Sequence, residues 1–278
     1  MIHERPCGAG RRLATAAAAL VLLGGCASAP PTSRVQGPEG ARGYRALFRG
    51  ETDGPAGKER FRMAAALLPP DRLRLEFSGP VGGPRLVVAV DGASVVAILP
   101  SERAYDSGPA GAGVLDRILG LPLAPAQLVA LLTGQPMCDA DKSEQQVQTK
   151  AAATFGRTLA WVEVTCPPDD IRYEGRSAER GGILKEASVR EGISGAMILE
   201  VEYDDHEDGL GPRWPHRIRI RLPRRKATVE LAALEGPVAG DVPGSLFSPP
   251  VPDGFEKRSL LASLSAPGLL GSTADRER

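Results

Sequence analysis

Residues 60–78, RFRMAAALLPPDRLRLEFS, show the clearest strand pattern in the sequence. Apolar side chains occupy every second position, first at 61, 63, 65 and 67 and then at 73, 75 and 77. Successive residues of a strand point to opposite faces of a sheet, so each half predicts a strand with one dry face and one wet face. Pro69-Pro70-Asp71 predicts the turn that joins the two strands.

The strand pattern continues towards the C-terminus. Asp91-Gly92 predicts a turn between strands at Leu86–Val90 and Ser94–Leu99. Both segments are apolar at nearly every position, which is typical of strands covered on both faces. With a last strand at Arg103–Ser107, we expect a meander of about six strands.

A short helical hairpin interrupts this pattern in the middle of the chain. Leucine and isoleucine recur at helical spacing in Gly113–Gly120 and in Pro125–Leu132. Alternation then resumes in seven segments: Gln146–Phe155, Thr158–Thr165, Ile171–Glu174, Ile183–Arg190, Ala196–Tyr203, His216–Leu222 and Thr228–Leu234. In the sixth, the arginines at 217, 219 and 221 alternate with apolar residues, and we favour a solvated sheet face over a polyanion site.

The N-terminus predicts export and lipid anchoring. Arginines at 5, 11 and 12 precede the apolar run Leu13–Leu23, which is too short to span a hydrocarbon core about 30 Å thick. The following Leu-Gly-Gly-Cys26 resembles the lipobox of bacterial lipoproteins, so residues 1–25 are expected to be a signal peptide and Cys26 the lipidated residue. The alternative is an ordinary secretory signal with a chance cysteine. Ala27, where retained lipoproteins carry Asp, indicates an outer-membrane protein that faces the periplasm.

Composition divides the rest of the chain into three parts. Residues 26–43 are rich in Pro, Gly and Ala and predict a lipidated tether, residues 44–235 predict one folded domain, and residues 236–278 predict a partly disordered C-terminal extension. Residues 246–260 of that extension are a candidate to cross the sheet. Cys138 and Cys166, the two remaining cysteines, favour a disulfide in an oxidising compartment, with two buried free thiols as the alternative.

The residues with catalytic potential are few. Lys plus Arg and Asp plus Glu are both 34, a balance that argues against nucleic acid as a partner. We find no nucleophile elbow, phosphate-binding loop or Cys-x-x-Cys pair, and we expect neither an enzyme nor a cofactor. Tyr203–Asp208 could hold a metal ion, but five polar residues between two strands fit a solvated hairpin tip better, so we expect no metal site.

Three stretches between Arg60 and Pro136 resemble the LolB family of outer-membrane lipoprotein receptors, part of the LolA/LolB-like lipoprotein-sorting superfamily. The first is the hairpin of residues 60–77, the second is the loop Ser78-Gly79-Pro80-Val81-Gly82, and the third is Leu115–Leu132 around Gly120-Leu121-Pro122-Leu123. Their order and spacing agree with the family over about 80 residues. The chain departs from the family in its few aromatic residues, its cysteine pair and its long tail.

The resemblance implies a mainly β fold with some α, a curved antiparallel half-barrel of about eleven strands with a short helical lid inserted mid-chain. It also implies a protein that binds acyl chains in an apolar cavity, receives lipoproteins from a LolA-like periplasmic carrier and helps to incorporate them into the outer membrane. The alternative is a related envelope lipoprotein that carries another lipid or has a structural or biogenesis role without transport.

The resemblance also implies the site residues. A protruding loop touches the membrane, here at Pro80, Val81 and Gly82. Candidates for the acyl cavity are the inward strand residues Leu73, Leu75, Phe77, Val88 and Val90 and the lid residues Leu115, Ile118, Leu119 and Leu128. Glycines at 111, 113 and 120 would let the lid hinge.

Overall fold

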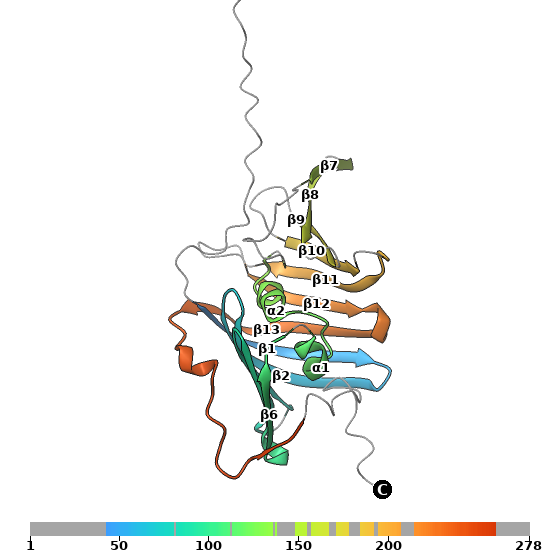
Figure 1. The fold of residues 1–278 in the computed structure, drawn as a ribbon. Coiled ribbons are helices and arrows are strands. Elements are labelled where there is room, and N and C mark those ends of the chain that lie inside the picture. The colour runs from blue at the N-terminus through green and yellow to red at the C-terminus, as the bar shows by residue number, and fades with distance from the viewer. Residues whose placement is uncertain are drawn as a thin grey trace, which may run out of the picture. The chain divides into compact units, whose positions relative to one another are not determined.

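The computed structural model describes residues 43–80, 82–111, 113–135, 137, 148–154, 157–166, 171–177, 184–191, 194–206 and 214–259, all within one compact unit. Within these ranges fourteen strands form a single sheet, in the order β14-β6-β5-β4-β3-β2-β1-β13-β12-β11-β10-β9-β8-β7 (Figure 1). The strands of the first half are β1 (Gly43–Gly54), β2 (Gly57–Leu68), β3 (Arg72–Ser78), β4 (Pro84–Asp91), β5 (Ser94–Leu99) and β6 (Ala104–Pro109). The others are β7 (Gln148–Thr154), β8 (Arg157–Cys166), β9 (Ile171–Ser177), β10 (Leu184–Glu191), β11 (Met197–His206), β12 (Pro215–Leu222), β13 (Ala227–Gly240) and β14 (Glu256–Lys257).

The sheet consists of two antiparallel meanders joined at its centre. Strands β1 to β6 form the first meander and β7 to β13 the second, and the predicted strand segments are confirmed in both. The join is the antiparallel pairing of β1 with β13, in which Phe48 lies opposite Ala233 and Thr52 opposite Val229. The sheet does not close into a barrel, as predicted. The described residues form fourteen strands rather than the eleven or so that the resemblance implies: six and seven in the two meanders, as the sequence pattern indicates, and β14 from the tail.

Two short helices lie between β6 and β7 in the sequence, as predicted. Helix α1 spans Val114–Leu119 and helix α2 spans Pro125–Leu132, and both lie against one face of the central strands (Figure 1). Gly113 and Gly120 flank α1 with φ angles of 79° and 73°, a left-handed conformation that favours glycine. The third predicted hinge, Gly111, has no positive φ.

The main core lies between this sheet face and the helices. It includes Phe48, Leu67, Leu73 and Leu75 from the first meander and Leu199, Val201, Ile218 and Ile220 from the second, together with Leu115, Ile118, Leu128 and Leu131 from the helices. Alternation along each strand places these side chains on one face. The helices thus bury the dry face that the sequence pattern predicts.

The opposite face of β4 and β5 is covered by the segment that follows β13. Val87, Ala89 and Ile98 are buried although they point away from the main core, and Phe247 in the following segment is 1% exposed. The Arg74 guanidinium donates to the Leu246 carbonyl oxygen over 3.3 Å. The predicted cover on both faces of these two strands is therefore confirmed.

This packing changes the predicted C-terminal boundary. The expected extension began at residue 236, but β13 continues to Gly240, where that residue pairs with Gly43. Ser248 donates to Asp91, and β14 pairs with β6 in parallel. Residues 236–259 therefore belong to the domain, since β13 and β14 pair within its sheet and Val242 and Phe247 are buried.

Several predictions fall outside the described residues. These are the signal peptide of residues 1–25, Cys26 and its tether, Val81, Cys138, and residues 260–278. The disulfide between Cys138 and Cys166 therefore stays a prediction. Among the described residues, no helix has the length and apolarity needed to cross a membrane.

Candidate functional site

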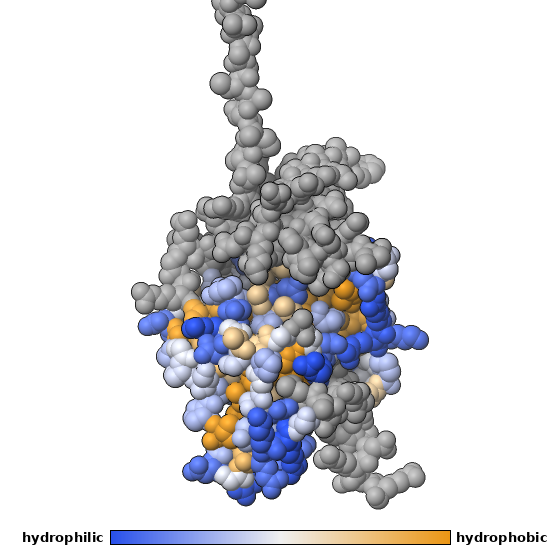
Figure 2. Space-filling view, viewed as in Figure 1, coloured by the Kyte–Doolittle hydropathy of each residue, from blue (hydrophilic) through white to orange (hydrophobic). Residues whose placement is uncertain are grey.

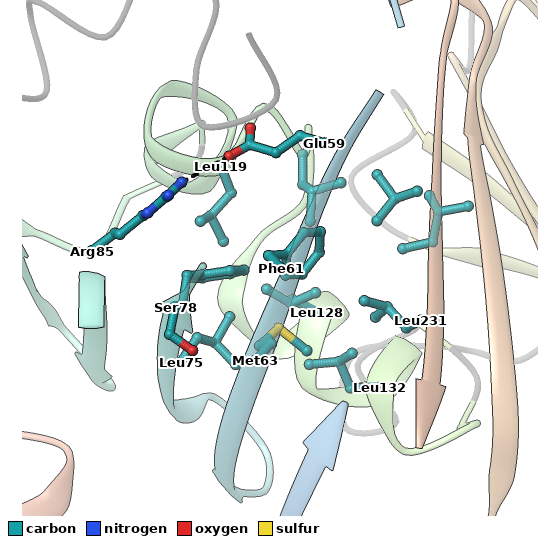
Figure 3. Close-up of a pocket in the computed structure, with 14 residues that line it drawn as sticks. Glu59, Phe61, Met63, Leu75, Ser78, Arg85, Leu119, Leu128, Leu132 and Leu231 are labelled. Atoms are coloured by element: carbon teal, nitrogen blue, oxygen red, sulfur yellow. Dashed lines mark hydrogen bonds and ion pairs between the residues drawn. The ribbon is translucent and has the colours of Figure 1, made fainter. Parts of the chain in front are cut away.

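An apolar cavity lies between the sheet and the two helices (Figure 3). Eleven of its fourteen lining residues are apolar and come from both meanders and from the helical hairpin: Phe61, Met63, Leu75, Phe77, Leu119, Leu121, Leu128, Leu132, Ile220, Val229 and Leu231. The other three are Glu59, Ser78 and Arg85. Met63, Leu75 and Leu128 are buried whereas the polar three are partly or fully exposed, so the mouth lies at the polar end.

The pairing of β1 with β13 creates this cavity. It places β12 and β13 beside the first meander, so that Ile220 and Val229 face the same space as Met63 and Leu75. Strand alternation then turns all of these side chains inward. Helices α1 and α2 form the opposite wall through Leu119 and Leu128. In Figure 2, viewed from the side of the helices, apolar residues show between hydrophilic ones on this face.

The enclosed part of the cavity is small. Its free space, counted out to the open mouth, is about 720 Å³, but the part wide enough for a water-sized molecule is about 60 Å³. Pockets that hold small molecules measure roughly 300–1,000 Å³. The enclosed part lies well below that range, since the larger volume includes open solvent at the mouth. An acyl chain would enter only if the helices moved away from the sheet.

One aromatic side chain owes its position to a glycine on the neighbouring strand. Phe61 lies opposite Gly50 in the register of β1 and β2, and a Cβ on Gly50 would lie 2.1 Å from the Phe61 ring. The ring therefore lies flat over β1 and reaches into the cavity, where its centroid is 5.7 Å from that of Phe77. The two rings form the apolar part of the wall nearest to the mouth.

The mouth is crossed by an ion pair. The Arg85 guanidinium on β4 donates to the Glu59 carboxylate on β2 over 3.2 Å, and Figure 3 shows the two groups meeting at one end of the cavity. Arg85 also lies against Gly79, where a Cβ would approach its guanidinium to 2.8 Å. The loop after β3 and the end of the cavity are thus held together by one side chain.

The predicted cavity residues divide into two groups. Leu75, Phe77, Leu119 and Leu128 line the cavity. The other five predicted residues are buried in the main core away from the cavity, namely Leu73, Val88, Val90, Leu115 and Ile118. The structure brings the second group close to the first but uses it to pack the helices on the sheet.

The predicted membrane-contact loop begins at the mouth. Ser78 lines the cavity, Pro80 is exposed, and Gly82 is exposed with a φ of 111°. Val81 lies outside the described residues. The loop predicted to contact the membrane therefore follows directly from a residue that lines the cavity.

Residues of the second meander were missed by sequence reasoning. Ile220, Val229 and Leu231 alternate with polar residues, so their inward orientation could be recognised, but the sequence does not show which strand lies next to β1. Glu59 and Arg85 were missed for another reason, since charged residues at strand ends are ordinary on a protein surface. Leu121 carried a usable signal, because it is an apolar residue in the connection between the two helical segments.

The arginine row of β12 lies on the outer face, as predicted. Arg219 pairs with Glu230 at 2.8 Å and with Glu202 at 3.3 Å, and Arg221 pairs with Glu202 at 2.7 Å. The hydrogen bond from Arg219 to Glu230 is the main reason that the pKa of the arginine is raised. Neighbouring strands thus neutralise the row, which removes the charge excess that a polyanion site requires.

Part of the candidate metal site, Tyr203–Asp208, lies within a strand rather than in a hairpin turn. Tyr203–His206 form the end of β11, where Tyr203 is buried and His206 lies 3.2 Å from the Lys185 amine. Residues 207–213 lie outside the described ranges. Among the residues that the structure describes, no group of three or more metal-ligating side chains comes together.

The fold is similar to those of several solved structures. A LolA superfamily protein from Nitrosomonas europaea matches with a TM-score of 0.57 at 12% identity, over 77% of this chain and 93% of that one. A putative outer membrane lipoprotein-sorting protein domain from Vibrio parahaemolyticus matches with a TM-score of 0.55 at 10% identity, over 76% and 92%. A DUF1329 family protein from Desulfovibrio piger reaches 0.58 at 10% identity, over 75% and 90%.

The likeness is one of structure and not of sequence. No protein-family model matches the sequence, and no curated protein sequence does. The chain has a LolA-like fold, an open sheet with two helices on one face.

Proposed function

We propose that this protein is a lipid-anchored outer-membrane protein that binds acyl chains between its sheet and its helices and helps to incorporate lipoproteins into the membrane. The observation that carries the proposal is the cavity itself, whose apolar lining is continuous from β2 to β13 and whose polar residues are confined to the mouth. Such a cleft suits a ligand with an apolar chain and a polar end. No specific polar contact inside the cleft is needed for a chain of methylenes.

The dimensions support a carrier rather than a permanent lipid store. An acyl chain releases about 0.8 kcal/mol for each buried methylene, so a chain of about 14 carbons would bind with roughly 11 kcal/mol in a fully formed cavity. Because the cavity is narrow without ligand, part of this free energy is used to move α1 and α2 away from the sheet. The bound chain is therefore held less tightly and can be passed on.

The remaining parts of the proposal come from the sequence. Lipidation of Cys26 would anchor the protein in the outer membrane facing the periplasm, where a LolA-like carrier would deliver its cargo. Val81 would touch the membrane during release, at about 1.5 kcal/mol for one buried valine, which suits a brief contact. Two LolA-type structural neighbours, one of them named as a lipoprotein-sorting domain, are consistent with this role.

Transfer into vesicles tests the proposal. A mature Cys26→Ser protein is loaded with a fluorescent triacylated peptide and mixed with phospholipid vesicles, and transfer is followed by fluorescence. We expect Val81→Glu to slow transfer severalfold without changing peptide binding, because a carboxylate opposes contact with the hydrocarbon region.

The matched control is Ala93→Glu, which adds the same charge at the exposed turn between β4 and β5. Equal transfer rates for the wild type and for Val81→Glu would refute the membrane-contact role. A wild-type protein that binds no acylated peptide would refute the proposed function as a whole and would favour a structural role.

A further inference from the structure

The polar residues of the cavity are few and lie together. Of fourteen lining residues only Glu59, Ser78 and Arg85 are polar, and all three border the mouth. A ligand whose acyl chain fills the cleft must leave its polar end where the apolar lining stops, because burying an unpaired polar group in the cleft costs free energy. The starts of β2 and β4, where Glu59 and Arg85 lie, are therefore the surface that meets the head group.

Arg85 is the group at this surface best suited to a negative charge. Its side chain is 51% exposed, and its guanidinium is directed across the mouth towards Glu59 (Figure 3). A guanidinium presents several N–H donors in one plane, which matches the oxygens of a phosphate or carboxylate. The backbone at Gly79 leaves room for this arrangement, since a Cβ there would collide with the guanidinium at 2.8 Å.

In the structure the Arg85 guanidinium is paired with the Glu59 carboxylate. The pair is partly exposed, at 51% and 35% for the two side chains, so its net contribution to stability is small. An anionic head group at the mouth can replace the Glu59 carboxylate at little cost. Covering of the mouth by the ligand would then strengthen the new contact, because charges interact more strongly when water is excluded.

We propose that Arg85 forms a head-group subsite at the mouth that selects acylated molecules carrying a phosphate or carboxylate, and that Glu59 competes with the ligand for this arginine. The inference rests on the proposed acyl-binding function and adds a ligand class to it. Single-chain anionic lipids are then expected to bind more tightly than neutral lipids with the same chain.

The test compares two lipids that differ only in the phosphate. The mature Cys26→Ser protein is titrated with 1-palmitoyl lysophosphatidic acid and with 1-palmitoylglycerol below their critical micelle concentrations, and palmitate is added to represent a carboxylate. For the wild type we expect tighter binding of the phosphate. For Arg85→Gln we expect this affinity to fall about tenfold, the lower end for loss of a hydrogen bond to a charged group, because Arg85 is half exposed.

The Glu59→Gln variant distinguishes a head-group subsite from a simple latch. In the subsite, Glu59→Gln frees Arg85, and the affinity for the phosphate rises by about two- to fivefold, the worth of an exposed ion pair. If the ion pair only closed the mouth, Arg85→Gln and Glu59→Gln would change the affinity in the same direction, and would do so for all three lipids. Palmitoylglycerol binding is expected to be unchanged in both variants.

Arg72→Gln is the matched control, since Arg72 forms a comparable exposed ion pair with Asp91 at 2.9 Å and does not line the cavity. Equal affinity of wild type and Arg85→Gln for the phosphate, with normal binding of palmitoylglycerol, would overturn the subsite and leave acyl binding standing. Failure of the wild type to bind any of the three lipids would overturn both.

Discussion

The contact between Gly50 and Phe61 shows how one residue shapes the cavity. Gly50 is buried on β1, on the same face as Phe48 and Thr52, where every other side chain fills the core. The absence of a side chain at this position lets the Phe61 ring cover the strand. The width of the cleft near its mouth therefore depends on Gly50. The glycine is needed for the space it leaves and not for its backbone conformation, since its φ is not positive.

Gly50→Ala tests this dependence. The new Cβ would meet the Phe61 ring at about 2.1 Å, so the ring must leave its position. We expect a loss of about 1–3 kcal/mol in the free energy of unfolding, as for other overpacked sites, and an altered affinity for acyl ligands. Urea denaturation and a lipid titration measure the two effects.

Gly54→Ala on the same strand is the control. A Cβ on Gly54 would lie 3.3 Å from the Cβ of Ala227, an approach that a slight shift relieves. Alanine also lowers the conformational entropy of the unfolded chain relative to glycine, which favours the folded state. We expect its stability to stay within about 1 kcal/mol of the wild type. Equal effects of the two substitutions would show that Phe61 is not held by Gly50.

At the scale of elements, an ion pair ties the lid to the sheet. Arg225, in the turn between β12 and β13, donates to Asp116 of α1 over 2.7 Å. The adjacent Arg224 of the same turn donates instead to Glu191 of β10 over 2.9 Å. If an acyl chain enters by displacing the helices, as proposed, the Arg225–Asp116 pair opposes that movement.

Arg225→Gln is expected to increase the association rate of an acyl ligand by about two- to fivefold, since an exposed ion pair contributes about 0.2–1 kcal/mol. Stopped-flow fluorescence measures the rate. Added salt should raise the wild-type rate towards that of the variant, because ions screen exposed pairs. Arg224→Gln is the control, and the same acceleration in both variants would contradict a lid contact.

The segment after β13 is a second element with a structural role. Phe247 is 1% exposed, and its neighbours Leu246 and Ser248 are hydrogen-bonded to β3 and β4. We expect Phe247→Ala to cost about 3–5 kcal/mol of unfolding free energy, as for other buried phenylalanines. Phe255→Ala in the same segment should cost clearly less, because Phe255 is only half-buried. Thermal unfolding of the two variants decides the matter, and equal stability would refute the role of the segment as a cover.

Local pattern explains which parts of the elements the sequence could predict. Strands, turns and the helical hairpin follow from the spacing of apolar residues over a few positions, and the structure confirms them. The position of Phe247 could be predicted only in part, since the uncovered apolar face of β4 and β5 indicated that some segment must lie there. Residues 246–260 were named as a candidate to cross the sheet, but the spacing of residues did not show that they would cover β4 and β5 in particular, because that contact joins distant parts of the chain.

At the scale of the molecule, the decisive feature is the pairing of the first strand with the last strand of the second meander. This pairing joins residues about 180 positions apart in the chain, such as Phe48 and Ala233, and it brings Ile220 and Val229 to the cavity. Sequence alternation indicated the inward face of β12 and β13 but not their neighbour in the sheet. For this reason part of the first-half wall was predicted, through Leu75, Phe77, Leu119 and Leu128, whereas the second-half wall was not.

The central claim is that the cleft between the sheet and the helices holds an acyl chain, and native mass spectrometry tests it most directly. The mature Cys26→Ser protein would be isolated from the periplasm without detergent. Leu121→Glu places a charge in the lining at the half-buried end of the cavity, and Leu99→Glu places the same charge at a half-buried site outside it.

We predict that the wild type and Leu99→Glu carry one acylated molecule in a substantial fraction of the protein, and that Leu121→Glu has lost it. A wild-type protein found only at the mass of its own chain, or a Leu121→Glu variant that retains lipid as well as Leu99→Glu does, would contradict the claim.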